Sequence, residues 1–457
     1  MMMRMIESNY TSKLDYTKCM DIVEKYQSEV LNDNKISVKL KLITKLLVKF
    51  PSLPSRISKN KLIAKIFKKW KGLTDDNKDK KISFTLYLSC VFLLLPIQNK
   101  KIFFSSFGGR NYSGNPRRIS EELYKLNPKL KYIWCINKDV SVKNLPPYIK
   151  RVDNNSLLAT FHLYTSKVWI DDSRKTIFFK KRKNQIYFQT WHGTPLKKIE
   201  FDAVDKLPNS YLNYALKDSE SLDYLLSGNK YSSDIYASAF RIDENKIANV
   251  GTPRNDQLCL KIDKEVSLFE KETFKLLFAP TFRNNKADNG QKQLDILGIP
   301  YLVKYFESLN KKVEIYLKFH PNVNQSLIKQ VEIRDLIKKY SVHLIDNNVS
   351  SEDTFLDMDL LITDYSSIFF DFALLNKPII LLNYDEDEYK KERGFYIDLD
   401  YLPLPKAKSY QEILAIFEHD RETLIEGPKM LLKKIGNFET GKATNFVTEK
   451  ILENIER

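Results

Sequence analysis

Residues 186–198 read IYFQTWHGTPLKK, a short apolar run that stops and at once presents a histidine, a glycine and a hydroxyl. The same arrangement recurs in LKFHP at residues 317–321 and in LLITDYSS at residues 360–367. In open α/β sheets, ligands bind in the crevice beyond the carboxyl ends of the strands. Three strand-like runs that each end in reactive side chains therefore predict one shared cleft.

Strand-like runs alternate with helical patterns in two series, separated by a polar stretch at residues 254–273. This alternation is typical of parallel sheets with crossover helices. We therefore expect an α/β protein with two Rossmann-like domains, at residues 100–256 and 257–457, after a basic helical region at residues 1–99. The helical tail from residue 409 onward is expected to pack across both domains, whose cleft would hold a nucleotide-activated donor and an acceptor.

The net charge of +16 is concentrated in one segment. Residues 36–71 contain eleven lysines and arginines and no acid, and without these eleven charges the rest of the chain carries only +5. The segment also has apolar residues at helical spacing, an arrangement that suits the surface of an anionic bilayer. We expect peripheral attachment to the cytoplasmic face of the membrane. The alternative is a solvated lysine-rich helix pair, and RNA binding is disfavoured because aromatic residues do not alternate with the basic ones.

The remaining composition points to an intracellular globular protein. The four cysteines lie far apart and fit neither a disulfide framework nor a zinc site. We expect no signal peptide, because polar and charged sequence follows the first ten residues. The apolar run within residues 82–99 is too short for a span and is expected to form a buried or interfacial helix.

Two of the five histidines are candidates for catalysis. His192 and His320 each follow a predicted strand directly and stand beside a turn-forming residue. An imidazole with a near-neutral pKa is a natural general base for a hydroxyl nucleophile, and His192 is our candidate. The alternative is that His192 only fixes its turn. The other three are His162, which stays unassigned, and His343 and His419, which we expect to be structural.

A phosphate site is expected where the run at residues 360–363 ends. Asp364, Ser366 and Ser367 stand at a strand-to-helix turn, where hydroxyls and backbone N–H groups can bind a phosphate. Plain helix capping by one of the two serines explains the pattern about equally well. Arg283 could bind a diphosphate bidentately, with a surface salt bridge as the alternative; Lys318 and Arg254 are weaker candidates of the same kind.

No cofactor or metal is called for by the sequence. The glycine-bearing turn at residues 108–117 lacks the GxGxxG spacing that would indicate NAD. No HExxH or Walker A sequence is present, and no DxD-type cluster is convincing.

Taken together, these motifs resemble the CDP-glycerol glycerophosphotransferase family of teichoic acid synthases, over residues 101–404. The resemblance depends on the joint order of the following motifs: Ser106–Gly109 with Asn115–Pro116, Trp191–Lys198, Gly251–Asp256, Ala279–Arg283, Lys318–Pro321, Thr363–Asp371 and Asn376–Ile380.

The resemblance implies a GT-B-like fold on a monotopic membrane enzyme. Such an enzyme transfers glycerol phosphate from CDP-glycerol to a lipid-linked polyol-phosphate or glycan acceptor and releases CMP. His192 would deprotonate the acceptor hydroxyl, with Gly193, Thr194 and Arg254 on the acceptor side. The donor diphosphate would be held by His320, Arg283, Lys318, Ser366 and Ser367, with Asp364 ordering their turn.

Several alternatives stay open at this point. CDP-ribitol or another CDP-alditol could be the donor, and an ordinary GT-B glycosyltransferase or an inactive membrane scaffold would share much of the pattern. The sequence does not separate primase from polymerase, or wall teichoic acid from capsule. It also leaves the oligomeric state open, a homo-oligomer included.

Overall fold

The computed structural model describes residues 92–93, 95–142, 145–154, 156–175, 181–261, 270–281, 283, 290–319, 323, 331–346 and 349–456. The basic segment at residues 36–71 and the apolar run up to residue 91 lie outside these residues, as does His320. The described residues fall into two compact units. One contains the residues before Ile102 together with α8 (Leu157–Thr165), and the other contains most of both sheets.

The first sheet has seven strands in the order β3-β2-β1-β4-β5-β6-β7. Their bounds are β1 Gln98–Ser105, β2 Lys131–Cys135, β3 Ile149–Val152, β4 Ser166–Asp171, β5 Ile186–Gln189, β6 Tyr224–Ser227 and β7 Ile247–Asn249. The helices of this half are α7 Gly114–Leu126, α8, α9 Asn209–Ser221, α10 Lys230–Phe240 and α11 Asp256–Cys259, with 3₁₀ turns η1 Phe107–Gly109, η2 Glu200–Lys206, η3 Glu244–Lys246 and η4 Pro253–Asn255.

The second sheet has six parallel strands in the order β10-β9-β8-β11-β12-β13. Their bounds are β8 Thr273–Phe278, β9 Lys312–Leu317, β10 Val342–Leu344, β11 Leu360–Thr363, β12 Ile379–Leu382 and β13 Lys406–Ala407. The helices that follow these strands are α12 Gln291–Leu297, α13 Ile299–Ser308, α15 Val331–Lys339, α16 Ser351–Phe355, α17 Ile368–Phe372, α18 Glu386–Arg393, α19 Tyr410–His419 and α20 Arg421–Ile435, with 3₁₀ turns η5 Ala373–Leu375 and η6 Leu399–Tyr401.

Both sheets are doubly wound. In each, the strand order reverses beside the first strand, between β1 and β4 in the first sheet and between β8 and β11 in the second. Ligands of such sheets bind at this switch point, beyond the carboxyl ends of the strands. The topology therefore assigns a functional role to the loops after these four strands.

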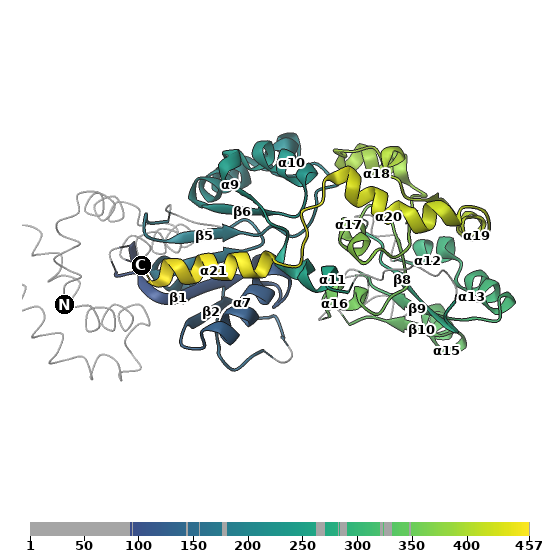
Figure 1. Cartoon of the computed structure of the whole chain (residues 1–457), viewed down its shortest axis with the longest axis horizontal. Coiled ribbons are helices and arrows are strands. Elements are labelled where there is room, and N and C mark those ends of the chain that lie inside the picture. The colour runs from purple at the N-terminus through teal and green to yellow at the C-terminus, as the bar shows by residue number, and fades with distance from the viewer. Residues whose placement is uncertain are drawn as a thin grey trace, which may run out of the picture. The chain divides into compact units, whose positions relative to one another are not determined.

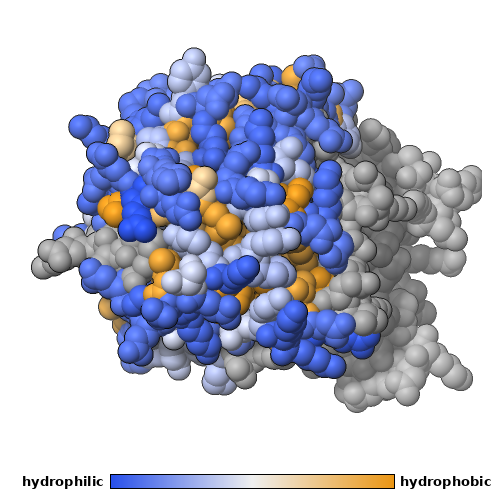
Figure 2. Space-filling view, turned by 90° about the vertical axis from the view of Figure 1, so that its right-hand side faces the viewer, coloured by the Kyte–Doolittle hydropathy of each residue, from blue (hydrophilic) through white to orange (hydrophobic). Residues whose placement is uncertain are grey.

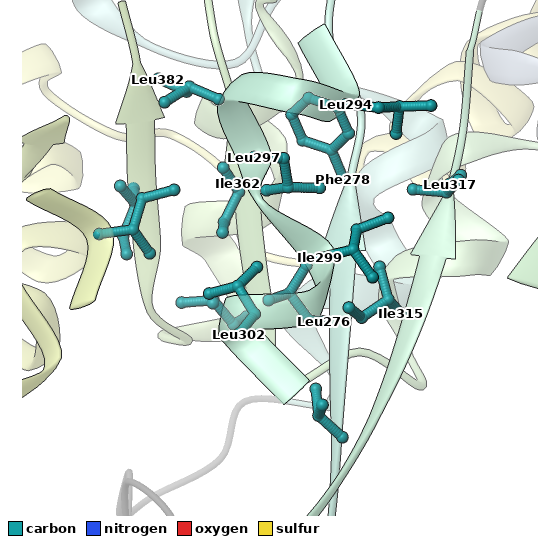
Figure 3. Packing of buried hydrophobic residues seen from close by; sticks show 14 of the residues in the cluster. Leu276, Phe278, Leu294, Leu297, Ile299, Leu302, Ile315, Leu317, Ile362 and Leu382 are labelled. Atoms are coloured by element: carbon teal, nitrogen blue, oxygen red, sulfur yellow. The ribbon is translucent and has the colours of Figure 1, made fainter. Parts of the chain in front are cut away.

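The central strands are apolar on both faces, which is why they form the interior of a parallel sheet. Along β8, Leu276 and Phe278 pack into one hydrophobic cluster, whereas Leu277 packs into the cluster on the other face. Figure 3 shows the first of these clusters, where Leu297 and Leu302 of the covering helices meet the strand residues. Truncating a fully buried leucine such as Leu302 to alanine would cost roughly 2–5 kcal/mol of stability.

The helical tail packs on both halves, as the sequence predicted. Helix α20 contacts β12 of the second sheet, and α21 (Ala443–Glu456) contacts α7 beside the first sheet. Val447 and Ile451 of α21 are fully buried in the core of that first half. Figure 1 shows this return of the chain, with α21 lying along the strands of the first sheet.

The surface at the α13 and α19 end of the molecule is mostly hydrophilic, with small apolar patches (Figure 2). Single exposed apolar residues such as Tyr301 are normal on a solvent-exposed protein surface. Among the described residues, no helix combines the length and the apolar character needed to cross a membrane.

Candidate active site

The histidine turn after β5 has a strained backbone that its neighbours hold in place. Trp191 has a positive φ of 49°, which is uncommon for a bulky residue. Its backbone N–H donates to Gln189 Oε1 at 3.0 Å, and its carbonyl oxygen accepts from Asn115 Nδ2 at 3.0 Å. Strain that is maintained in this way is characteristic of functional sites. The turn places the next residue, His192, at the end of the sheet.

The ring of His192 is fixed by one hydrogen bond. Its Nδ1 atom lies 2.7 Å from the backbone carbonyl oxygen of Asp172. A carbonyl oxygen can only accept, so Nδ1 carries the proton and Nε2 keeps its lone pair. Burial lowers the pKa of His192 to about 4, with the charges of Arg254 and Arg110 adding to the effect and the bond to Asp172 opposing it. At neutral pH the ring is therefore an uncharged base.

Asp172 connects the two strands that flank the switch point of the first sheet. It follows β4, and its carboxylate accepts from Ser106 Oγ at 2.7 Å and from the Phe107 backbone N–H at 2.6 Å, both at the end of β1. Burial, followed by the nearby Asp171 carboxylate, raises the pKa of Asp172 to about 7. Asp172 was not among the residues expected in the site, although it directly follows β4, and the end of a strand is the signal that singled out His192.

The predicted motifs of the two sheets meet at Gly193 and Ser367. Gly193 has a φ of 151°, and a β-carbon on it would lie only 2.9 Å from Ser367 Oγ and 3.4 Å from Arg254 Nη2. Only glycine allows this approach. The neighbouring Thr194 is buried, and its hydroxyl accepts from Asn229 Nδ2 at 2.8 Å.

Arg254 connects the histidine turn to the second half of the molecule. Its Nη1 donates to the His192 carbonyl oxygen at 2.9 Å, and its Nη2 pairs with Asp371 Oδ2 at 2.5 Å. The other oxygen of Asp371 accepts from Asn255 Nδ2 at 2.9 Å. Asn255 also donates to Glu439, which in turn accepts from the backbone and side chain of Thr252. Arg254 thus acts through the backbone of His192, as part of a buried polar network.

Ser366 and Ser367 lie in the turn between β11 and α17, both partly buried. Ser367 stands at the N-cap position of α17, but its side chain makes no capping hydrogen bond. The capping alternative therefore does not account for the Ser367 hydroxyl. Asp364 precedes the pair, and its Oδ1 accepts from the Thr281 backbone N–H at 2.8 Å, which ties the ends of β8 and β11 together.

Arg283 is held by two carboxylates rather than standing free. Its Nε and Nη2 donate to Asp385 at 2.8 and 3.0 Å, and its Nη1 pairs with Asp364 at 2.9 Å. The guanidinium also lies 4.8 Å from the centre of the Tyr389 ring. These two ion pairs of Arg283 are buried and connect residues at the ends of neighbouring strands. Arg283 therefore does not form the surface salt bridge that was the alternative. A diphosphate ligand would have to share this guanidinium with both carboxylates.

The other predicted residues are distributed as follows. Lys318 Nζ donates to the Val349 carbonyl oxygen at 2.7 Å, and burial lowers its pKa. His162 is buried on α8, His343 is exposed and stacks on Tyr316, and His419 is exposed at the end of α19.

A cavity of about 600 Å³ lies beyond β12. Acidic side chains dominate its lining, with three lysines among them: Asp385, Glu386, Asp387, Glu388, Lys390, Asp398, Asp400, Lys406, Lys408 and Glu412. Like charges repel, so this cavity is poorly suited to an anionic diphosphate. We therefore do not assign the donor site to this cavity, although its volume is large enough for a small ligand.

Two doubly wound parallel sheets, with a histidine turn from one packed against a serine turn from the other, define an enzyme of the GT-B-like class. The chain belongs to the CDP-glycerol:poly(glycerophosphate) glycerophosphotransferase family, whose sequence model matches residues 87–453. This confirms the family that the sequence motifs indicated.

Individual relatives agree with the family assignment. A teichoic acid poly(glycerol phosphate) polymerase of Bacillus spizizenii is 33% identical over 381 residues, covering 79% of this chain and 93% of that protein. The polymerase of the same name from Staphylococcus epidermidis is 32% identical over 387 residues, and there the chain spans only 51% of the relative's length. The solved structure of the wall teichoic acid polymerase TagF matches with a TM-score of 0.71 and 27% identity, covering 87% of this chain and 98% of that one.

Proposed function

We propose that this protein transfers glycerol phosphate from CDP-glycerol to a hydroxyl of a lipid-linked acceptor and releases CMP, in the synthesis of teichoic acid or a related capsule-type polymer. The observation that carries the proposal is the hydrogen bond between His192 Nδ1 and the Asp172 carbonyl oxygen, which leaves Nε2 to accept a proton. This ring stands beside the contact between Gly193 and Ser367. Family membership supplies the donor and the reaction class.

In the proposed reaction the acceptor oxygen attacks the phosphorus that carries the glycerol. The new bond joins the acceptor oxygen to this phosphorus, and the bond from the same phosphorus to the bridging oxygen of CMP breaks. The proton of the acceptor hydroxyl goes to His192 Nε2. Because phosphoryl transfer needs mostly positioning and charge stabilisation, the fixed ring and its rigid turn are suited to the task.

The donor side is proposed to lie at the ends of β8, β9 and β11. Ser366 and Ser367 would donate hydroxyl groups to the diphosphate, and Lys318 and His320 would supply positive charge and hydrogen bonds. Arg283 and Asp364 would act chiefly by holding the strand ends that carry these groups, given the contacts that Arg283 already makes. The acidic cavity beyond β12 adjoins this site at Asp385, which pairs with Arg283, but its acidic lining is poorly suited to the diphosphate itself.

A lipid-linked acceptor gives the basic segment at residues 36–71 a role. We propose that its eleven cations hold the enzyme on an anionic bilayer, each contributing about 1 kcal/mol near the surface. Co-sedimentation of the full chain with vesicles of anionic and of neutral lipid tests this. A variant with six of the lysines changed to glutamine should lose binding to anionic vesicles, and unchanged binding would contradict the attachment.

Donor profiling tests the reaction itself. The purified full chain is incubated with a lipid-linked glycerol phosphate acceptor and with CDP-glycerol, CDP-ribitol or a UDP-sugar, and nucleotide release is measured. We expect CMP release with CDP-glycerol, and the matched variant His192→Ala should remove it. CMP release with CDP-ribitol alone would show that the donor is CDP-ribitol. Turnover of UDP-sugars alone would overturn the proposed function.

A further inference from the structure

The turn after β1 has three successive residues in the left-handed region of the backbone map. Phe107, Gly108 and Gly109 all have positive φ, at 47°, 63° and 81°. Protein donors occupy all three carbonyl oxygens of the turn. These donors are Arg110 Nε at 2.8 Å from the Phe107 oxygen, Asn154 Nδ2 at 3.0 Å from the Gly108 oxygen and the Asn137 backbone N–H at 2.7 Å from the Gly109 oxygen. The carbonyl oxygens are thus neutralised where they would otherwise repel a negative ligand.

Arg110 is anchored at this turn while its side chain stays exposed. Nε donates to the carbonyl oxygen of Phe107, whose ring centre lies 5.7 Å from that of His192. Within the described part of the chain, no carboxylate pairs with the Nη groups of Arg110. The guanidinium is therefore available beside the proposed base.

The positive charge of Arg110 also acts on the His192 ring. Its positive charge is one of the causes that lower the pKa of His192, together with that of Arg254. Arg254 is buried and paired with Asp371, so it cannot offer its charge to a ligand without breaking that pair. Of these two cations beside His192, only Arg110 combines exposure with freedom from a carboxylate partner.

We propose that Arg110 binds a phosphodiester of the polyol-phosphate acceptor, next to the hydroxyl that His192 activates. This inference rests on the proposed function and assigns the acceptor side of the same site. A guanidinium can bind a phosphate with two parallel N–H···O bonds. Arg110 therefore selects a phosphate-bearing acceptor.

The test compares Arg110→Gln, the conservative Arg110→Lys and the control Lys129→Gln, which removes a charge from an exposed loop residue of the same half. Binding of a lipid-free oligo(glycerol phosphate) to the full chain is measured by calorimetry at two salt concentrations. For Arg110→Gln we expect binding weaker by about tenfold to a hundredfold, as for loss of a charged hydrogen-bond pair, and a shallower salt dependence. Arg110→Lys should recover part of the affinity, and Lys129→Gln should match the wild type.

Steady-state kinetics adds a readout that a purely structural role would not produce. In Arg110→Gln the KM for the acceptor should rise by a similar factor, while the KM for CDP-glycerol and the melting temperature stay unchanged. Equal binding by Arg110→Gln and wild type would overturn the proposal. So would an equal loss in Lys129→Gln, or a rise in the KM for CDP-glycerol alone.

The two proposals fail in different ways. If the wild type binds the oligomer through Arg110 but releases no CMP from CDP-glycerol, the proposed function is wrong and the Arg110 site stands. If the wild type releases CMP and Arg110→Gln is unchanged in both readouts, only the Arg110 assignment is wrong.

Discussion

The Nδ1 atom of His192 lies 2.7 Å from the backbone carbonyl oxygen of Asp172, so the imidazole is held in a single tautomer. The carboxylate of the same aspartate binds the Ser106 hydroxyl and the Phe107 N–H at the end of β1. One residue thus sets the orientation of the proposed base and ties together the two strands at the switch point. Proton transfer to His192 in the proposed reaction depends on this orientation.

The first prediction concerns pH. Because burial lowers the pKa of His192 to about 4, the ring stays neutral where an ordinary imidazole is largely protonated. We expect kcat/KM for CDP-glycerol, which reports on the free enzyme, to show no protonation step near pH 6.5 on its acid side. A pH–rate profile between pH 5 and 8 measures this. A loss of activity with an apparent pKa near 6.5 that persists in Asp172→Asn, which removes the carboxyl group with a pKa of about 7, would mean that the ring is not desolvated as described.

The second prediction concerns the contact between Gly193 and Ser367. In Gly193→Ala the new β-carbon would lie 2.9 Å from Ser367 Oγ, and the backbone φ of 151° would be strained as well. We expect a loss of about 1–3 kcal/mol in the free energy of unfolding, as for other overpacked positions. CMP release should also fall at least tenfold, because the serine turn is displaced from the histidine turn.

Gly108→Ala is the matched control for this substitution. Its φ of 63° is also strained for alanine, but a β-carbon there meets nothing within 4 Å. The double variant Gly193→Ala/Ser367→Ala removes the hydroxyl and should regain part of the lost stability in chemical denaturation. No recovery in the double variant would show that the clash is not the cause.

The third prediction concerns the buried pair of Arg254 and Asp371. Asp371→Ala leaves the Arg254 charge without its partner in a buried environment, which should cost about 3–5 kcal/mol in the free energy of unfolding. The exposed pair Lys230–Asp234 is the control, and Asp234→Asn should change stability by less than about 1 kcal/mol. Equal effects of the two substitutions in urea unfolding would contradict the account.

The fourth prediction concerns Glu439, which bonds to Thr252 and Asn255. Burial raises its pKa to about 7, so between about pH 4.5 and 7 the folded protein binds more protons at this site than the unfolded chain does. The stability that Glu439 contributes is therefore present at low pH and decreases as the pH rises through this window. The difference in unfolding free energy between wild type and Glu439→Gln should shift in favour of the variant from pH 5 to pH 8. The exposed Glu426→Gln should show no such trend.

Most of the fold could be predicted because parallel strands are apolar runs with recognisable ends. The apolar run that opens the stretch 186–198 contains β5, and the run at residues 360–363 coincides with β11. Two edge strands were missed, since β3 is half polar and β13 has only two residues. Helix α7 starts at Gly114, inside the stretch 108–117 that was expected to be a turn, and Gly114 takes up a φ of 62° at its first position.

The site could be predicted only in part, because strand ends show which residues reach one edge but not which of them touch. His192 and Ser367 follow from that rule, and the contact at Gly193 brings their turns together. Asp172 directly follows β4 and could have been found by the same rule, whereas the role of Glu439 depends on contacts between distant parts of the chain, which no local pattern encodes. The assignment of His320 stays a prediction, since that residue lies outside the described part of the chain.

The most direct test of the central claim is the single-turnover rate of CMP release in His192→Gln, with CDP-glycerol and acceptor both saturating. General bases contribute about a hundredfold to ten-thousandfold, so we expect the rate to fall at least a hundredfold while the melting temperature and the affinity for CDP-glycerol are retained. A rate within a few-fold of the wild type would show that another group takes the proton, and the role assigned to His192 would be wrong.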